Sequence, residues 1–300
     1  MSSSYRWVAE LLLLSAIWGS SFLFMHLASP EINPMALTFI RCVIATVILG
    51  AIVYATEKQN LKQMLKYWPV LTLLGITNTA LPFSIWGYVT EYLESGTMGV
   101  INATAPMFGA LIAWFWLKDP LKISAVFGMF LGLVGVGVLL IMPQDNLTIE
   151  PVSVLMGLLA CFSYGIAACL SRAKAIGMSP MTVAAGSQLY AAIVLLPFTI
   201  AVWPEHVPSD AAIASTLFLG VACSGLAFYL YYKLIAEQGV ARALANMYLI
   251  PLFAVLWGAL FLGEVLALRT LIGGILILTG VAFTTGYFSF ERKNQADNLI

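Results

Sequence analysis

The chain has 300 residues, of which 61% are hydrophobic and only 9% are charged. A soluble domain carries about 25% charged residues, so this composition cannot cover a water-facing surface and indicates an integral membrane protein. The formal net charge is zero and no basic tract occurs, which argues against a nucleic-acid partner. The four cysteines lie inside apolar runs, where we expect packing thiols and no disulfide framework.

Ten apolar runs are long enough to cross a bilayer, which takes about 20 apolar residues. In chain order they are 7–27, 34–55, 68–90, 96–117, 121–142, 152–171, 180–203, 212–235, 240–262 and 267–288. The first run is too long for a signal segment and is expected to be a retained helix. A membrane β-barrel would show segments of alternating polarity, which these runs lack. The pattern predicts an all-α membrane protein with ten transmembrane helices.

The basic residues favour one side of this topology. Twelve of the fourteen Lys and Arg residues precede the first helix or follow an even-numbered one, whereas the other connections contain only Arg269. The remaining basic residue, Arg41, lies within the second helix. Because cytoplasmic loops carry an excess of Lys and Arg, both termini are predicted to be cytoplasmic, in a bacterial-type inner membrane.

The chain repeats itself with a shift of 145 residues. Pro106 matches Pro251 and Asp119 matches Glu264, and the same shift holds on both sides of these positions. In the first two helices of each copy the shift is 146, as for Trp18 and Tyr164. Such an internal repeat decides the architecture. It predicts a first repeat over 1–145, a second over 146–290 and a cytoplasmic tail over 291–300.

Each predicted repeat contains five helices, so the second copy must enter the membrane from the opposite side. Inverted repeats are a recurring architecture of secondary transporters, with the substrate site near the midplane. The alternative is that duplication only enlarges a bundle, as in a non-transporting sensor or scaffold. No nucleotide-binding loop, metal-ligand spacing or catalytic set occurs, so we expect neither an enzyme nor a cofactor or metal.

Short motifs in four helices point to a family. Helix 1 contains Trp18-Gly19-Ser20-Ser21-Phe22, and helix 2 runs from Pro34 to Arg41 in a P-x-x-x-x-x-x-R pattern. Helices 4 and 9 each combine a central proline with an acidic residue at the helix end, although Lys118 replaces the usual glycine before the first acid. These features resemble the drug/metabolite transporter superfamily, specifically its EamA-type ten-helix exporters. The resemblance implies a proton- or gradient-dependent exporter of small metabolites, often amino acids.

Arg41 is the foremost candidate for a substrate contact. It lies about 10 Å along helix 2, at about 1.5 Å per residue. An arginine near mid-bilayer costs roughly 2.5–3.5 kcal/mol, so it must face the bundle, water or a partner. Two roles stay open: binding a substrate carboxylate, or a structural role in which it reaches the headgroups or pairs with Glu31 or Glu91.

Uncharged polar and aromatic groups inside the helices are further candidates. They could contact substrate, bond across helices or fill the core. The predicted substrate-binding set is Trp18, Arg41, Asn78, Trp86, Asn102, Tyr164, Tyr229, Tyr232, Asn246 and Tyr248. Pro82, Pro106 and Pro251 each remove a backbone hydrogen bond and are predicted to kink or gate their helices.

Charged residues near the helix ends have other expected roles. Glu10 either couples protons or lies at the cytoplasmic interface near Arg6, and His26 is expected to be a solvated interface residue. Asp119 and Glu264 are predicted to cap the helix that follows each of them.

Helices 5 and 10 are rich in glycine. Gly128-x-x-x-Gly132 allows close helix approach, so these glycines are expected to form either the packing spine of each half or a homodimer face. We expect an inner-membrane secondary transporter that exports amino acids or related small metabolites by alternating access. A carrier of sugars or other organic solutes and drugs is the alternative within transport. The expected partners are a small-molecule solute, the lipid bilayer and protons.

Overall fold

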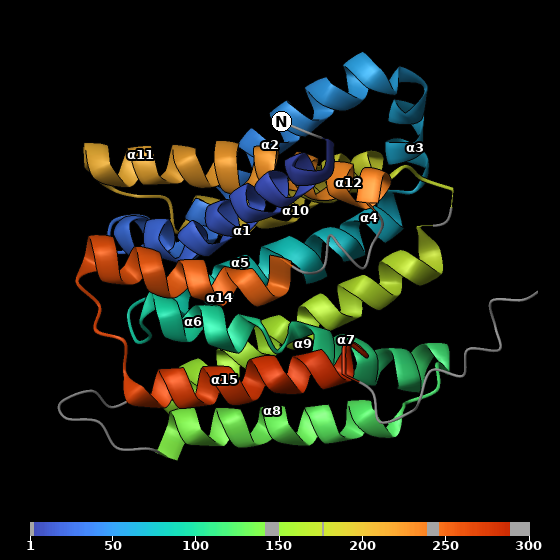
Figure 1. The fold of residues 1–300 in the computed structure, drawn as a ribbon. Helices are drawn as coiled ribbons and strands as arrows, with labels where there is room; N and C mark the ends of the chain where they lie inside the picture. Colours follow the sequence, from blue (N-terminus) through green and yellow to red (C-terminus); the bar gives the residue numbers. More distant parts are fainter. Residues whose placement is uncertain (1–2, 142–149, 176, 239–245, 289–300) are drawn as a thin grey trace, which may run out of the picture.

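A computed structural model describes residues 3–141, 150–175, 177–238 and 246–288, and the predicted tail lies outside them. Secondary structure within these ranges is entirely helical (Figure 1). The first repeat comprises α1 (Ser3–Ala28), α2 (Pro34–Thr56), η1 (Lys58–Asn60), α3 (Leu61–Lys66), α4 (Trp68–Gly75), η2 (Ile76–Ala80), α5 (Leu81–Val89), α6 (Ser95–Asn102), α7 (Ala105–Ile112), η3 (Ala113–Leu117) and α8 (Ile123–Ile141). The second comprises α9 (Pro151–Lys174), α10 (Pro180–Ala201), α11 (Asp210–Phe218), η4 (Leu219–Leu226), α12 (Ala227–Gln238), α14 (Asn246–Trp257), η5 (Gly258–Leu262) and α15 (Leu268–Thr284).

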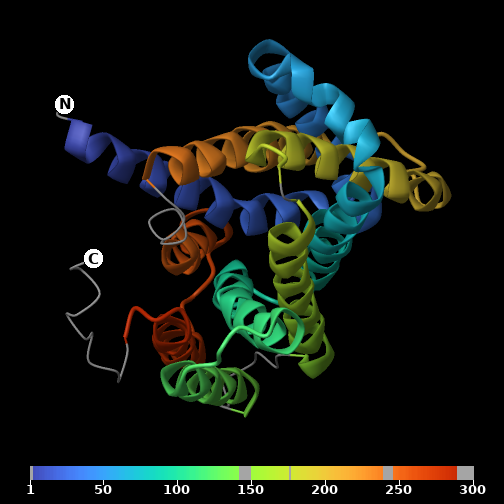
Figure 2. The same ribbon diagram turned by 90° about the vertical axis from the view of Figure 1, so that its right-hand side faces the viewer.

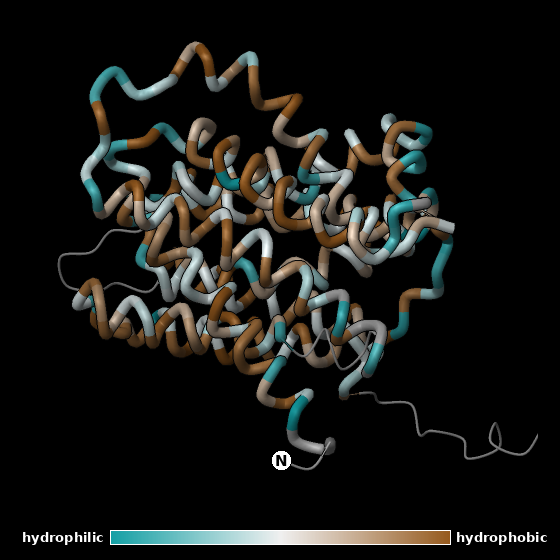
Figure 3. Tube along the Cα trace, turned by 90° about the horizontal axis from the view of Figure 1, so that it is seen from above, coloured by the Kyte–Doolittle hydropathy of each residue, from teal (hydrophilic) through white to brown (hydrophobic). Residues whose placement is uncertain are grey.

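The helices follow the predicted apolar runs. Within the described ranges, eight helical stretches are long and apolar enough to cross a membrane, and two shorter apolar stretches, Asn246–Leu262 and Leu268–Thr284, occupy the last two runs. Polar segments gather at the helix ends and apolar ones along their middle (Figure 3). We call the end of the bundle where α1 begins the basic end, and the end where α1 finishes the acidic end. The short helices η1 and α3, at the basic end, were not predicted.

Helix starts are encoded locally. The side chain of Asn33 accepts a hydrogen bond from the backbone N–H of Met35, and Ser179 does the same for Thr182. A proline follows each of these capping residues, at a position where its missing N–H costs nothing. The predicted starts of the second helix in each repeat are therefore confirmed.

Four π-helical segments interrupt the α-helices at equivalent places in the two repeats. The segments η3 and η5 match with the shift of 145 at both bounds, and η2 falls within the equivalent of η4. In η2 the N–H of Leu81 bonds to the carbonyl of Ile76, because Pro82 cannot supply an amide to Asn78 four residues back. The effect predicted for Pro82 thus takes the form of a π turn.

The exits from η3 and η5 are also alike. Each ends at a left-handed residue, Lys118 at φ 60° and Gly263 at φ 67°. The next N–H then bonds back six residues, from Asp119 to Ala113 at 3.2 Å and from Glu264 to Gly258 at 3.1 Å. The two copies therefore share this backbone path, although only the second has glycine at the left-handed position.

Replacing Lys118 with glycine is expected to stabilise the protein. A non-glycine residue in the left-handed conformation destabilises the folded state by roughly 1–2 kcal/mol. Glycine removes this strain but loses more conformational entropy on folding, so the net gain in stability is smaller. Thermal unfolding in detergent should show a higher Tm for Lys118→Gly than for Lys118→Ala, which also loses the contact between the ammonium and Phe115 but keeps the strain. Equal Tm values for the two variants would contradict the strain argument.

Helices α8 and α15 pack against each other through glycine, side by side in Figures 1 and 2. A Cβ on Gly128 would overlap the carbonyl oxygen of Gly280, and one on Gly135 would lie 2.8 Å from that of Gly273. These two crossings are related by the repeat shift. These glycines pack helices closely, as predicted, but the expected spine within each half was wrong, because the crossings join the two repeats.

Two other helix crossings are also equivalent. A Cβ on Gly19 of α1 would lie 3.0 Å from the backbone nitrogen of Ala254 in α14. A Cβ on Gly165 of α9 would lie 2.9 Å from the backbone nitrogen of Gly109 in α7. Gly19 matches Gly165, and Ala254 matches Gly109. The first helix of each repeat is therefore locked against the fourth helix of the other.

Candidate functional site

Arg41 is buried within the bundle, with 2% of its surface exposed. Its Nε donates to the hydroxyl of Ser224 at 3.0 Å, and its Cζ lies 4.0 Å from the centre of the Phe83 ring. Its Nη1 lies 3.7 Å from the sulfur of Met25. The arginine therefore does not reach the headgroups.

Neither acid considered as a partner pairs with Arg41. Glu31 instead accepts hydrogen bonds from the N–H and hydroxyl of Ser209, and Glu91 is exposed. Among the described residues, no carboxylate lies within ion-pair distance of Arg41. A buried charge without a counter-ion is costly, so this position suits an anion supplied from outside the chain.

Trp86 and Tyr164, both predicted candidates, belong to the same region. Trp86 is 2% exposed and packs edge-on against Phe22 with ring centroids 5.5 Å apart. Its Nε1 is buried and makes no hydrogen bond of normal geometry. Tyr164, on α9, lies close enough to interact electrostatically with both Trp86 and Arg41. The region thus combines a guanidinium, a buried indole N–H and aromatic surface.

Asn102 contributes its backbone to this region. Its carbonyl has no helical partner because Pro106, four residues on, has no N–H. The thiol of Cys161, one turn before Tyr164 on α9, lies 3.9 Å from this carbonyl and 3.3 Å from that of Ile101. Sequence reasoning missed Cys161, since it treated the thiols as packing groups. All four cysteines are indeed free and buried.

The two equivalent prolines differ in their effect. The helix breaks at Ala103-Thr104 before Pro106, whereas Pro251 lies inside the continuous helix α14. The hydroxyl of Thr104 bonds to the carbonyl of Ile101 at 2.8 Å and thereby supports the break. The equivalent residue in the second copy, Leu249, has no hydroxyl. The helix is therefore interrupted before Pro106 and continuous at Pro251, and kinking or gating by the two prolines stays a prediction.

Trp18 and Asn78 lie beside the site without completing it. The indole N–H of Trp18 already donates to the carbonyl of Cys223, at 3.1 Å, and its ring packs against Phe228 and Tyr231. Asn78 is half-buried in η2 and carries the carbonyl that Pro82 leaves without an amide.

The remaining candidates form no hydrogen bond with Arg41 in the described part of the chain or have side chains outside it. Tyr229 is 37% exposed, and the Tyr248 hydroxyl bonds to Thr285 at 2.6 Å. Asn246 is fully buried, and both polar atoms of its amide lack a hydrogen-bond partner in the described part of the chain. The side chain of Tyr232 lies outside the described residues.

The site is charged in one repeat only. Ser187 occupies the position equivalent to Arg41, and its neighbour Gln188 donates to Thr79 at 3.3 Å. Thr79 is itself the equivalent of Ser224. In both halves a side chain from the second helix therefore bonds to a hydroxyl in the π segment of the opposite repeat. Only the pair of Arg41 and Ser224 brings a charge.

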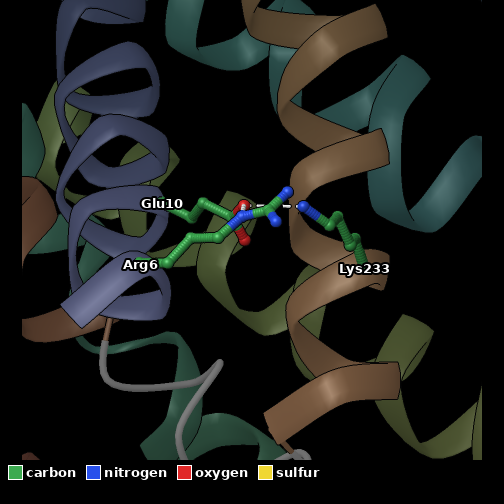
Figure 4. Close-up of polar contacts among 3 residues, drawn as sticks. All are labelled: Arg6, Glu10 and Lys233. Carbon is green, nitrogen blue, oxygen red and sulfur yellow. Dashed lines mark hydrogen bonds and ion pairs between the residues drawn. The ribbon is translucent and has the colours of Figure 1, made fainter. Parts of the chain in front are cut away.

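At the basic end, Glu10 holds two helices together (Figure 4). Its Oε1 accepts from Arg6 at 3.1 Å on the same helix and from Lys233 of α12 at 2.6 Å. The expected position near Arg6 is confirmed, and the tie to Lys233 is an addition that the sequence did not reveal.

Glu264 and Asp119 do not cap the helices that follow them. Glu264 accepts from the backbone N–H groups of Ser95 at 2.9 Å and Gly96 at 3.4 Å, so it caps α6. Asp119 forms an ion pair with Arg172, with 3.0 Å between Nη2 and Oδ1. The cap prediction is therefore wrong for Asp119, and for Glu264 it named the wrong helix.

Local environment shifts the pKa values of two acids near these contacts. The hydrogen bond from Arg172 holds the pKa of Asp119 below its ordinary value. Burial, together with the charge of Glu264, raises the pKa of Glu94, which directly precedes α6. The closure of α6 against η5 thus places two carboxylates near each other.

Long apolar helices that enclose a buried cation, with two equivalent halves, define a multi-pass membrane protein of the transporter class. The chain belongs to the EamA-like transporter family, which matches it twice, over residues 6–141 and 151–286. The resemblance noted in the sequence is thereby confirmed, and so is the duplication.

Individual relatives cover almost the whole chain. The uncharacterized transporter YoaV of Bacillus subtilis is 27% identical, over 93% of this chain and 96% of its own. A probable terminal-alkyne amino-acid exporter of Streptantibioticus cattleyicolor is 24% identical, over 91% of each chain. A solved crystal structure shares the fold, with a TM-score of 0.64 at 20% sequence identity. The match covers 93% of this chain and 97% of the chain in that structure.

Proposed function

We propose that this protein exports amino acids or related small carboxylates by alternating access, with Arg41 holding the carboxylate. The observation that supports this proposal is the environment of Arg41, which is buried against Ser224, Met25 and Phe83. No carboxylate of the described residues lies within ion-pair distance of it. Arginine presents a planar fork of donors that matches a carboxylate, so such an anion completes the site. The relative named as a probable amino-acid exporter supports this substrate class.

The other groups around Arg41 suit the rest of such a solute. Phe83, Trp86 and Tyr164 offer apolar and aromatic surface for a side chain. The backbone carbonyl of Asn102 is an acceptor for an ammonium group, as freed carbonyls are in other transporters with interrupted helices. Of the remaining predicted set, Trp18 and Asn78 border this region. Asn246, Tyr248, Tyr229 and Tyr232 remain proposals for other stages of the pathway.

The proposed architecture is ten transmembrane helices in two inverted repeats, 1–145 and 146–290. Since each repeat has an odd number of helices, the two copies face opposite ways and exchange roles between the two open states. The Lys and Arg excess at the basic end favours a cytoplasmic position for that end and for both termini, in a bacterial inner membrane. We propose a solute or proton gradient as the driving force.

Counterflow in proteoliposomes tests this function. Vesicles are loaded with pooled unlabelled amino acids, and the uptake of labelled aromatic and aliphatic ones is followed. Transient accumulation above that in protein-free vesicles is expected. If folded protein gives no accumulation with any amino acid, the substrate class is wrong. The same assay with sugars and organic cations then separates another carrier from a non-transporting protein.

A further inference from the structure

The two repeats treat one pair of equivalent carboxylates differently. Asp119 and Glu264 follow the same π segment and the same left-handed residue, and their backbone N–H groups make the same hydrogen bond. Their side chains nevertheless bind different partners, Arg172 for Asp119 and the N-terminus of α6 for Glu264. The difference therefore arises in the side chains and their surroundings, since Glu264 is one methylene longer than Asp119.

His26 is the counterpart of Arg172, by the shift of 146 that relates the first helices of the repeats. Arg172 lies on α9, which is locked against α7 at Gly165. His26 lies on α1, which is locked against α14 at Gly19. Because the two crossings are equivalent, the repeat predicts that His26 faces Glu264 as Arg172 faces Asp119.

His26 lacks the bond that its counterpart makes. Its Nδ1 is buried and has no hydrogen-bond partner among the described residues. Glu264, the acid that the repeat assigns to it, is held by Ser95 and Gly96 instead. Asp119 thus pairs with α9, the helix that packs against α7. Glu264 instead binds α6 and not α1, the helix that packs against α14.

We propose that Glu264 alternates between the N-terminus of α6 and the side chain of His26, and that this exchange closes and opens the acidic end during transport. In the state described here the acidic end is closed. When α6 moves away from η5, the carboxylate of Glu264 loses the N–H groups of Ser95 and Gly96. The side chain of His26, on the helix that packs against α14, then replaces them. The proposal needs only that the protein is a transporter and does not depend on the substrate.

Close packing around the carboxylate supports a closed acidic end. Residues 95–101 of α6 are all buried. A Cβ on Gly96 would lie 2.8 Å from the side chain of Val255, and one on Gly99 would lie 2.7 Å from that of Ala254. The hydroxyl groups of Thr97 and Thr270 lie 3.2 Å apart across the same junction. Opening this end must separate these surfaces.

A glycine shapes the seat of Glu264. A Cβ on Gly258 would overlap the carboxylate of Glu264, so the present position requires glycine there. The equivalent residue in the first repeat is Ala113, whose Cβ would occupy the space that the Glu264 carboxylate takes in the second repeat. This difference, together with the longer side chain of Glu264, agrees with the unequal pairing of the two acids. It also supplies a variant, Gly258→Ala, that disturbs the seat and leaves both Glu264 and His26 in place.

The test uses a reporter cysteine, Met98→Cys, in the full chain in proteoliposomes. Met98 is fully buried in the closed acidic end, and the native cysteines are buried as well. A membrane-impermeant maleimide added from the acidic side measures opening. Glu264→Gln, Gly258→Ala and His26→Arg are each expected to raise the labelling rate about fivefold or more, a typical size for coupling between two states. His26→Leu is expected to lower it.

A double variant separates exchange from unrelated effects. In the Glu264→Gln background, His26→Arg should no longer change labelling, because the neutral amide cannot form the ion pair. An unchanged effect of His26→Arg in that background would overturn the proposal, as would wild-type labelling in both His26→Arg and His26→Leu. His206→Leu, which replaces the exposed histidine at the same end, is the matched control and should label like the parent. Thermal unfolding of each variant confirms that the protein is folded.

Discussion

Replacing Arg41 with alanine is expected to reduce amino-acid counterflow by about 10- to 100-fold while the protein stays folded. A hydrogen bond to a charged group contributes about 1.5–3 kcal/mol, and the alanine variant loses such bonds to the substrate carboxylate. Arg41→Lys keeps the positive charge but loses the planar guanidinium that can bind a carboxylate through two parallel hydrogen bonds, so it should retain part of the activity. Initial rates in proteoliposomes over a range of substrate concentrations measure the effect as a rise in KM.

The control for this prediction is Arg6→Ala, which removes an arginine that is exposed at the basic end. Its counterflow should stay close to wild type. Thermal unfolding in detergent checks the fold, because the loss of a buried, uncompensated charge is not expected to lower stability. If Arg41→Ala transports at the wild-type rate, Arg41 is a structural residue and the carboxylate must bind elsewhere.

A methyl group at Gly128 is expected to disrupt the junction of the two repeats. The new Cβ would overlap the carbonyl oxygen of Gly280 and lie 2.8 Å from the backbone nitrogen of Thr284. Both are backbone atoms, so the strain cannot be relieved by a side-chain rotation. Overpacking of this kind costs about 1–3 kcal/mol, and more where the backbone must move. Gly128→Ala should therefore unfold at a clearly lower temperature than the wild-type protein.

Gly137→Ala provides the matched comparison on the same helix. A Cβ at Gly137 meets nothing within 4 Å. Alanine is favoured over glycine inside a helix by roughly 0.5–1 kcal/mol, so this variant should be as stable as wild type or more so. Equal losses of stability in the two variants would show that the α8–α15 contact is not as tight as described.

Features that depend on local sequence were the most predictable. The caps Asn33 and Ser179, each followed by proline, marked the start of α2 and α10 because capping is decided within a few residues. The apolar runs located the helices because a bilayer-spanning helix needs a fixed apolar length. The repeat shift then predicted which residues would be equivalent, as the matching π segments confirm.

The site was predictable only in part. Sequence singled out Arg41 as costly within a membrane helix and named Trp86 among the aromatic candidates. It did not point to Ser224, Met25 or Phe83, which are ordinary within a helix. Which residues meet depends on how helices cross, and the crossings are set by glycine contacts far along the chain. The break before Pro106 and the continuous helix at Pro251 were likewise not predictable from the prolines, which occur in both copies.

The left-handed exit after each π segment also carries information about descent. Lys118 and Gly263 adopt the same backbone conformation, although only glycine does so without strain. Two copies that share a strained path, at the same distance from a shared π segment, inherited it from one ancestral half. The turn is therefore older than the duplication, and its shape does not depend on glycine, since the first copy adopts it with lysine.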